Sequence, residues 1–290
     1  MNLKHFFYRK YYEKLDLNEV GKDEKSDWAE DANKKLYNFS FKNRGSALPL
    51  DSKVFSNSYP KGRFKRFHLC TLYPGLIIGT GYLHETKTKE EIKIGFHFDH
   101  TTGLPVLPGH SIKGVLRSVF PTFGKKDQLK EAKAEYISSL LGKNSEFSND
   151  EKKLHWVQKL DEAIFEGKIR EKGVKKSLPR RDVFFDAVIC GTENKGGKIV
   201  GPDFLTPHAK PLKNPVPLPF LKVLPGVIWE FSFLLHDTEI DDIKISAQEK
   251  ELLFKRILLE QGAGAKTNVG YGRFKLYNCK PPSEKHHGRW

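Results

Sequence analysis

Hydrophobic and polar residues alternate or cluster along this chain in patterns typical of strands and helices. Residues 63–85 and 93–100 are rich in aliphatic and aromatic side chains broken by glycine, proline or polar residues, so we expect both to be extended. Between Pro108 and Phe120 the apolar positions recur every three or four residues, at Ile112, Val115, Leu116, Val119 and Phe120. This spacing predicts one buried face of a helix, which Ser111 or His110 would cap.

The rest of the chain alternates further predicted helices and strands with one long segment that lacks a period. Residues 124–181 are expected to form a helical insertion that ends in a basic run. We expect a buried strand at 182–190, a projecting loop over 191–219 and a strand over 220–235. A helix over 247–262 should turn Leu252, Leu253, Ile257 and Leu258 inward, and residues 271–277 should close the fold as a strand.

Without its insertions, the order of elements is strand, helix, strand, strand, helix, strand. This is the β-α-β-β-α-β plan of a ferredoxin-like, RRM-like α+β domain. We expect that domain over residues 63–278, after an irregular, partly helical N-terminal extension over 1–62 and before a polar tail over 279–290. A four-stranded sheet of this kind can serve RNA recognition, although a fold does not fix a function.

Charge suggests a partner for such a domain. The 290 residues carry 50 Lys and Arg against 36 Asp and Glu, a formal charge of +14. A surplus of this size favours a polyanion, because neutralised phosphates release condensed counterions, but it also keeps a protein soluble. The cysteines Cys70, Cys190 and Cys279 are far apart, which argues against a disulfide framework or a zinc site. No secretory signal or membrane-spanning run is present, so we expect a cytoplasmic protein without membrane, metal or cofactor.

The segment from Gln261 to Phe274, QGAGAKTNVGYGRF, resembles a phosphate cradle at first sight. A Walker A loop needs a glycine before its Lys-Thr pair and a helix after it, but here Ala265 precedes Lys266 and a strand follows. The pattern therefore does not support nucleotide hydrolysis. A glycine-rich backbone beside Lys266 and Arg273 instead suits an extended ribose-phosphate chain. The alternative is a helix cap at Gly262 followed by a flexible turn.

Two other segments offer phosphate contacts. The first turn of the predicted helix at 108–120 presents free N–H groups, and Lys113 and Arg117 lie four residues apart on one flank. The loop over 191–219 is rich in lysine and proline, and Phe204, Pro207 and His208 could stack on bases or wedge between them. An ordinary amphipathic helix and a plain surface loop are the competing interpretations.

Nuclease chemistry is the alternative function. Asp99 and several histidines, among them His97 and His100, lie close in sequence before the predicted helix, and a histidine could act as general base on a 2′-hydroxyl. Strand alternation, however, places His97 and Asp99 on one face and His100 on the other. The sequence gives none of these histidines a catalytic partner.

Two motifs then carry a family resemblance. GLPVLPGHSIKGVLR (Gly103–Arg117) resembles the G-x-P-x-I-P-G-S-S-x-K-G-x-x-R signature of CRISPR RAMP proteins, and GAGAKTNVGYGRF resembles their C-terminal glycine-rich loop. VFFDA, DFLTPHAKP and the proline-rich stretch into FLKV are similar to one branch, the sixth subunits of Cmr (type III-B) complexes. The resemblance covers about residues 64–278.

The resemblance implies a non-catalytic subunit that binds guide RNA (crRNA) and the guide–target duplex in RNA-guided antiviral defence. It would cap the filament at the guide 3′ end, beside the first Cmr subunit and near the fourth and fifth. The enzymatic rival is a metal-independent RAMP endoribonuclease that processes guide precursor. His110 stands where the family usually has serine, which puts that contact in doubt. The implied RNA-binding residues are His110, Ser111, Lys113, Arg117, Gly264, Ala265, Lys266, Thr267, Asn268, Gly270, Tyr271 and Arg273, and the implied thumb residues are Phe204, Pro207, His208 and Lys210.

Overall fold

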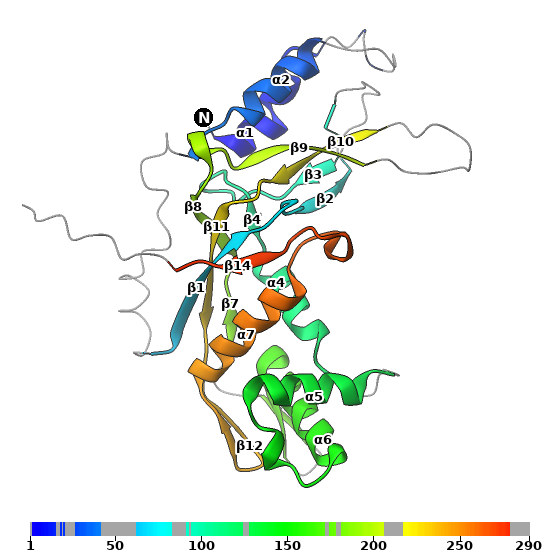
Figure 1. Cartoon of the computed structure of the whole chain (residues 1–290), viewed down its shortest axis with the longest axis vertical. Coiled ribbons are helices and arrows are strands. Elements are labelled where there is room, and N and C mark those ends of the chain that lie inside the picture. The colour runs from blue at the N-terminus through cyan, green and yellow to red at the C-terminus, as the bar shows by residue number, and fades with distance from the viewer. Residues whose placement is uncertain are drawn as a thin grey trace, which may run out of the picture.

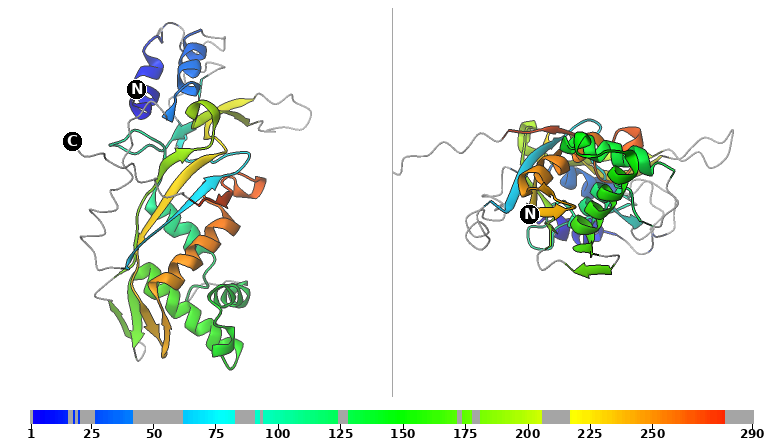
Figure 2. Two further views of the ribbon diagram at one scale, coloured as in Figure 1. Left: turned by 60° about the vertical axis from the view of Figure 1, so that its left-hand side comes forward. Right: turned by 90° about the horizontal axis from the view of Figure 1, so that it is seen from below.

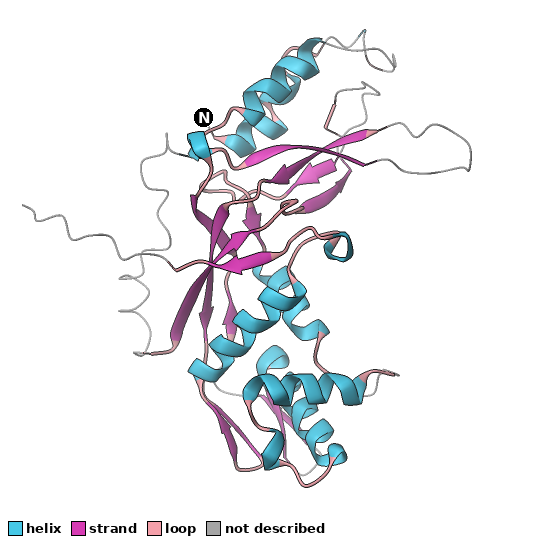
Figure 3. Cartoon of the chain, viewed as in Figure 1, coloured by secondary structure: helices cyan, strands magenta, loops and turns pink. Residues whose placement is uncertain are grey.

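The computed structural model describes residues 2–15, 18, 20, 27–41, 62–82, 91–92, 94–123, 128–171, 174–177, 181–205 and 217–278. They form a mixed α+β fold around an antiparallel sheet (Figure 1). Strands occupy the middle of the molecule, one pair of helices lies at one end, and the other helices lie beside and below the sheet (Figure 3).

The central sheet has the strand order β14-β1-β11-β8-β4, and β7 also pairs with β11. Its pairings are antiparallel. β11 lies at its centre, and all eight of its residues are buried, as the hydrophobic run VIWEFSFL requires. The strands are β1 (Phe64–Thr71), β4 (Val106–Leu107), β7 (Val183–Phe184), β8 (Ala187–Thr192), β11 (Val227–Leu234) and β14 (Phe274–Leu276).

Two helices, α4 (Gly109–Ser118) and α7 (Ala247–Gln261), cover one face of this sheet (Figure 2). Ile112, Leu116 and Phe120 are buried, and Val115 and Val119 pack against the same core, which confirms the predicted apolar face. In α7, Ser246 and Glu249 form a capping box, and Leu253, Ile257 and Leu258 are buried. Leu252 was wrongly predicted to face inward: it is 40% exposed, and Phe254 fills the core instead.

The chain follows the predicted order of strand, helix, strand, strand, helix, strand, but three predicted strands are each divided. Residues 63–85 form β1 and β2 (Gly79–Tyr82), separated by a turn that contains Pro74 and Gly75. Residues 220–235 form the end of β10 (Leu218–Val223) and β11, separated at Pro225–Gly226. Residues 182–190 fall into β7 and β8, and alternate residues of β8 are partly exposed. A proline or positive-φ glycine ends the ladder at the first two breaks.

The insertion is helical only in part. Its helices α5 (Lys130–Leu141) and α6 (Asp150–Asp161) are followed by a π-helical turn over Glu162–Glu166. Gly167 then takes φ +63, which ends the helix, and a hairpin of β5 (Lys168–Glu171) and β6 (Val174–Ser177) carries much of the predicted basic run.

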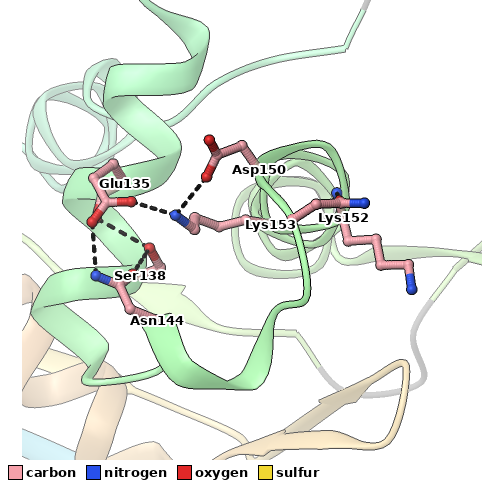
Figure 4. A network of polar contacts seen from close by, with 7 residues as sticks. Glu135, Ser138, Asn144, Asp150, Lys152 and Lys153 are labelled. Atoms are coloured by element: carbon pink, nitrogen blue, oxygen red, sulfur yellow. Dashed lines mark hydrogen bonds and ion pairs between the residues drawn. The ribbon is translucent and has the colours of Figure 1, made fainter.

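Polar contacts join α5 to α6 (Figure 4). Lys153 of α6 pairs with Glu135 of α5 and with Asp150, and Asn144 donates to Glu135 at 2.7 Å. The neighbouring Lys152 side chain points away from this network. The network therefore fixes the two helices to each other at the surface of the insertion.

The N-terminal segment packs at the opposite end of the sheet from the insertion (Figure 1). It contains α1 (Leu3–Tyr8), a 3-10 turn over Lys10–Tyr12 and α2 (Asp27–Tyr37), and it buries Phe7 and Tyr11. The Tyr8 hydroxyl donates to the Phe96 carbonyl at 2.5 Å, at the end of β3 (Ile94–Phe96), which pairs with β2. A further hairpin, β12 (Thr238–Ile240) and β13 (Ile243–Ile245), lies in a segment for which no element was predicted.

Candidate nucleic-acid interface

The glycine-rich segment forms a closed loop between α7 and β14. The α7 helix ends at Gly262 with φ +74, and the Ala263 N–H donates to the Gly272 carbonyl at 2.9 Å, which closes the loop. The Arg273 guanidinium donates to the Glu260 carbonyl, one of the acceptors left free at the end of α7. Gly262 is thus a helix cap, as the competing interpretation held, and Arg273 has a structural partner.

Most glycines in this loop serve close packing of the backbone. A Cβ at Gly272 would lie 1.8 Å from the Ala263 carbonyl oxygen, and one at Gly264 would lie 2.5 Å from the Ile77 carbonyl oxygen. Both residues also have positive φ, which favours glycine. Close backbone packing within the protein therefore accounts for most of the glycines in this loop, and their number does not by itself indicate a ligand.

The tip of the loop, Lys266–Asn268, is the part that is open to a ligand. Lys266 and Asn268 are exposed, and Thr267 is half-buried. Lys266 adopts a left-handed conformation with φ +59 and precedes a 3-10 turn over Thr267–Val269. Within the described part of the chain, no backbone oxygen accepts from the N–H groups of these three residues. Successive free N–H groups beside a lysine form a concave anion site.

A turn that the sequence did not single out supports this loop. Residues 72–78, here called the 72–78 turn, lie between the glycine-rich loop and β10. Gly272 N–H donates to the Gly75 carbonyl at 2.8 Å, and Ala265 N–H donates to Ile77 at 3.0 Å. On the other side, Leu76 and Val223 exchange two backbone hydrogen bonds of 2.9 and 2.8 Å. Only its Pro-Gly pair signals the turn in the sequence, and those residues identify a turn without its partners.

The segment predicted as a thumb loop over 191–219 is partly ordered: Gly191 and Thr192 still belong to β8, a 3-10 turn follows at Lys195–Gly197, and a β-ribbon comes after it. β9 (Val200–Leu205) pairs with β10 in register from Val200–Val223 to Leu205–Leu218, and we call this pair the thumb ribbon. Phe204 is 55% exposed on it. The other thumb residues of the sequence prediction, Pro207, His208 and Lys210, lie outside the described residues.

A charged cluster ties the thumb ribbon to the glycine-rich loop. Asp203 of β9 accepts hydrogen bonds of 2.6 Å from Lys222 of β10 and from the hydroxyl of Tyr271. Burial favours a raised pKa for Asp203, but the hydrogen bonds from Lys222, Tyr271 and Phe204 N–H outweigh it and lower the pKa. Burial and the bond to Asp203 raise the pKa of Tyr271. The Tyr271 hydroxyl therefore has a partner within the protein.

The first turn of α4 differs from the prediction in its capping. Pro108 is the N-cap and makes no side-chain capping bond, and His110 and Ser111 lie within the first turn and are exposed. The Asp186 carboxylate accepts from Gly109 N–H at 2.7 Å and thus occupies part of the anion site at this helix end. Lys113 is half-buried, with its ammonium 5.7 Å from the centre of the Phe184 ring.

Arg117 contacts the insertion. Its guanidinium donates to both oxygens of Asp161, at 3.0 and 2.7 Å, and to Glu166 at 2.8 Å. The Asp161 side chain is only 2% exposed, so the ion pair is largely removed from water. The Nε and Nη2 groups of the guanidinium are engaged in these bonds, and the role of Arg117 as a phosphate ligand stays a prediction.

The structure brings some predicted residues together and leaves others apart. The ends of β1 and β8 and the starts of β11 and β14 meet at one end of the sheet, through the pairs Thr71–Phe274, Cys70–Ile228 and Val227–Thr192. The glycine-rich loop, the 72–78 turn and the thumb ribbon all leave from that end. The first turn of α4 starts lower, where β4 pairs with Ala187 and Val188, on the same side of the sheet as the loop (Figure 1).

The candidate nuclease residues do not form one site. Asp99 accepts from Thr102 N–H at 2.6 Å within its own turn, and His100 contacts Lys4 at 2.7 Å. Burial favours a raised pKa for Asp99, but this bond and neighbouring backbone N–H groups lower it. His68 lies apart on β1, 3.1 Å from Glu230. Among the described residues there is no metal-binding group of three or more His, Cys, Asp or Glu, and no helix long and apolar enough to cross a membrane.

The profile of the RAMP superfamily matches residues 68–275, which is more than half of the chain. This protein belongs to the RAMP superfamily. Membership implies a ferredoxin-like core, and the sheet order of this RAMP protein agrees with one. The matched range includes α4, the thumb ribbon and the glycine-rich loop.

Proteins of Cmr systems are among those similar to this RAMP protein. It is 29% identical over 209 residues to the CRISPR system Cmr subunit Cmr6 of Pyrococcus furiosus, and the match covers 60% of this chain and 59% of that protein's length. A chain in the cryo-EM structure of the type III-B Cmr-beta complex bound to cognate target RNA has the same fold, with a TM-score of 0.50, 19% identity, and 87% and 72% of the two chains covered. The crystal structure of Cmr6 from Pyrococcus furiosus matches with a TM-score of 0.39 at 20% identity, covering 76% of this chain and all of the other.

Proposed function

We propose that this RAMP protein is a non-catalytic, guide-RNA-binding subunit of a type III-B Cmr effector complex. One observation supports this proposal most strongly. The loop tip at Lys266–Asn268 presents a lysine and N–H groups for which the described residues supply no partner, and it lies at the end of the sheet where the thumb ribbon leaves. Superfamily membership and the net charge of +14 favour RNA as the anion.

The chemistry of the tip fits a phosphate backbone better than a nucleotide. Backbone N–H groups and an ammonium contact phosphate oxygens without selecting a base, so binding should be tolerant of sequence. No helix begins after the tip, since β14 follows, and so nothing there resembles the helix N-terminus of a nucleotide-hydrolysing loop. We therefore assign Lys266, Thr267 and Asn268 to the RNA backbone. Lys113 is the second cation of choice, because it contacts an aromatic ring and has no carboxylate partner among the described residues.

The likeness to Cmr6 and to a chain of a target-bound Cmr-beta complex suggests the partners. We propose that this protein assembles with other Cmr subunits, the first, fourth and fifth among them, around the guide RNA and its target. The thumb ribbon would then reach the guide–target duplex through Phe204 and the residues beyond it. Copurification tests this: after tagging this chain in its native host, other Cmr proteins and an RNA with a defined 5′ tag should accompany it.

Salt dependence of RNA affinity tests the phosphate contacts. If the full-length protein holds about six phosphates of single-stranded RNA, log K should fall with log salt at a slope near −4, from about −0.7 per phosphate. Lys266→Ala should make the slope shallower by about 0.7, with no change in base preference. Lys244→Ala is the matched control, because Lys244 is 78% exposed on β13, away from the loop. A flat salt dependence, or equal slopes for the two variants, would refute the proposed interface.

The absence of RNA cleavage is tested separately. Labelled repeat RNA is incubated with the purified protein in EDTA and analysed for discrete products. We expect intact RNA, because Asp99 is occupied with backbone N–H groups of its own turn and His100 with Lys4. Specific cleavage that His68→Ala, His97→Ala, His100→Ala or His110→Ala abolishes would replace this proposal with the metal-independent endoribonuclease.

A further inference from the structure

The 72–78 turn presents one aromatic side chain to solvent. Tyr73 is 84% exposed, the largest exposed fraction among the large hydrophobic residues described. Its ring and hydroxyl make no hydrogen bond or ring contact with the described residues. A single exposed tyrosine is common on protein surfaces, so exposure alone gives it no role.

The backbone that carries Tyr73 is held on both sides. Leu72 N–H donates to the Arg273 carbonyl at 2.8 Å, and Gly75 accepts from Gly272 at 2.8 Å. Leu76 is bonded to Val223 on the opposite side. The ring is therefore displayed from a turn that is fixed between the glycine-rich loop and the thumb ribbon, which lowers the entropy lost when a ligand contacts it.

Tyr73 also lies next to the loop tip. A Cβ on Gly270 would be 3.6 Å from Pro74 Cδ, so the apex of the turn meets the end of the tip. Val269, the residue before Gly270, is 68% exposed and adds an apolar surface there. An exposed ring and an apolar side chain thus lie beside the loop tip, where the described residues supply no partner for Lys266 or for the N–H groups of Lys266–Asn268.

We propose that Tyr73 stacks on an unpaired nucleobase of the RNA strand whose backbone lies on Lys266–Asn268. Every base has a π-face, so an aromatic ring beside a phosphate site adds affinity without selecting a sequence. A protein partner would match the apolar surface of Tyr73 and Val269, but it would leave the neighbouring N–H groups and Lys266 without an anion. This inference rests on the proposed RNA interface and adds a base contact to it.

The test measures binding of the full-length protein to single-stranded RNA, with and without one abasic position. Tyr73→Ala should weaken binding by about tenfold, whereas Tyr73→Phe should bind as the wild type does, since the ring is kept. The salt slope should not change, because no phosphate contact is lost. One abasic position should weaken wild-type binding and leave Tyr73→Ala unaffected. Leu129→Ala, at a side chain 62% exposed within the insertion, is the control for loss of an exposed apolar group.

The outcomes separate this inference from the function on which it rests. If Lys266→Ala makes the salt slope shallower but Tyr73→Ala binds RNA like the wild type, the stacking contact is refuted and the RNA interface stands. If Tyr73→Ala keeps its RNA affinity and loses copurifying subunits, the ring contacts protein, and the inference is equally refuted. If the wild-type protein and its complex bind no RNA, both proposals fail.

Discussion

Asp203 is the residue through which the thumb ribbon and the glycine-rich loop act on each other, and Asp203→Asn tests that connection. The carboxylate accepts from Lys222 and Tyr271, both at 2.6 Å. A hydrogen bond to a charged group contributes about 1.5 to 3 kcal/mol. Solvent reduces this contribution, because the Asp203 side chain is 25% exposed. The asparagine side chain of the variant can also still accept one hydrogen bond. We expect a loss of about 1 to 2 kcal/mol in unfolding free energy.

The pH dependence of this loss has a defined sign. The pKa of Asp203 is lowered in the folded protein from an ordinary value of about 3.9. A carboxyl group with a lowered folded pKa stabilises the protein above its unfolded pKa, and this stabilisation disappears as the pH falls through the folded value. The difference between the wild type and Asp203→Asn should therefore be complete from pH 7 to about pH 5 and should narrow below about pH 4.

Thermal unfolding followed across pH measures the effect. A loss of 1 to 2 kcal/mol corresponds to a melting temperature lower by about 2 to 8 °C for a chain of this size. Amide exchange in β9 and β10 should also become faster. Asp241→Asn is the matched control: Asp241 is 54% exposed, accepts from Lys159 at 2.8 and 2.7 Å, and lies in the β12–β13 turn. Two results would refute the proposed role of the Asp203 carboxylate in linking the thumb ribbon to the glycine-rich loop. The first is that Asp203→Asn destabilises the protein no more than Asp241→Asn, and the second is that its effect is unchanged at acidic pH.

Two further predictions concern the core and the loop. Lys250 is 1% exposed, and its ammonium lies 2.6 Å from Asp182. Lys250→Met should therefore lower the unfolding free energy, measured by chemical denaturation, by about 3 to 5 kcal/mol, because it leaves the Asp182 charge buried and unpaired. The double variant Lys250→Met with Asp182→Asn should recover most of this stability, and no recovery would contradict the argument. Gly272→Ala should lower the melting temperature markedly, because its Cβ would lie 1.8 Å from the Ala263 oxygen, whereas Gly114→Ala, with nothing within 4 Å in a helix, should be neutral or stabilising. Equal effects of the two glycine substitutions would contradict the packing argument.

Elements with a local signal could be predicted from the sequence. The apolar face of α4 follows from side chains spaced every three or four residues, and Ser246 with Glu249 forms the box that starts α7. The order of the core elements follows in turn, because each is defined by its own period. Leu252 shows the limit of this argument, since a run of two leucines does not tell which of them faces the core.

Features set by contacts distant in sequence could not be predicted. Pro225–Gly226 divides β10 from β11 within one apolar run, but the sequence does not reveal that β10 pairs with β9 while β11 pairs with β1 and β8. The 72–78 turn had no chemical signal beyond Pro-Gly, yet it links the loop to the thumb ribbon. The π-helical turn at Glu162–Glu166 and the hairpin after it likewise depend on packing of the insertion.

A basic or aromatic residue in a motif supports RNA binding only to the extent that the protein leaves it without a partner. To place its Nε or Nη2 group on a phosphate, Arg117 would have to give up Asp161 or Glu166, and leaving the nearly buried Asp161 unpaired would cost about 3 to 5 kcal/mol. A phosphate contact at a solvated surface does not offset that cost. Tyr271 is similarly bound to Asp203. Lys266 has no such competitor among the described residues, so it can contact a phosphate without that cost, and the motif residues around it act mainly by holding the loop in place.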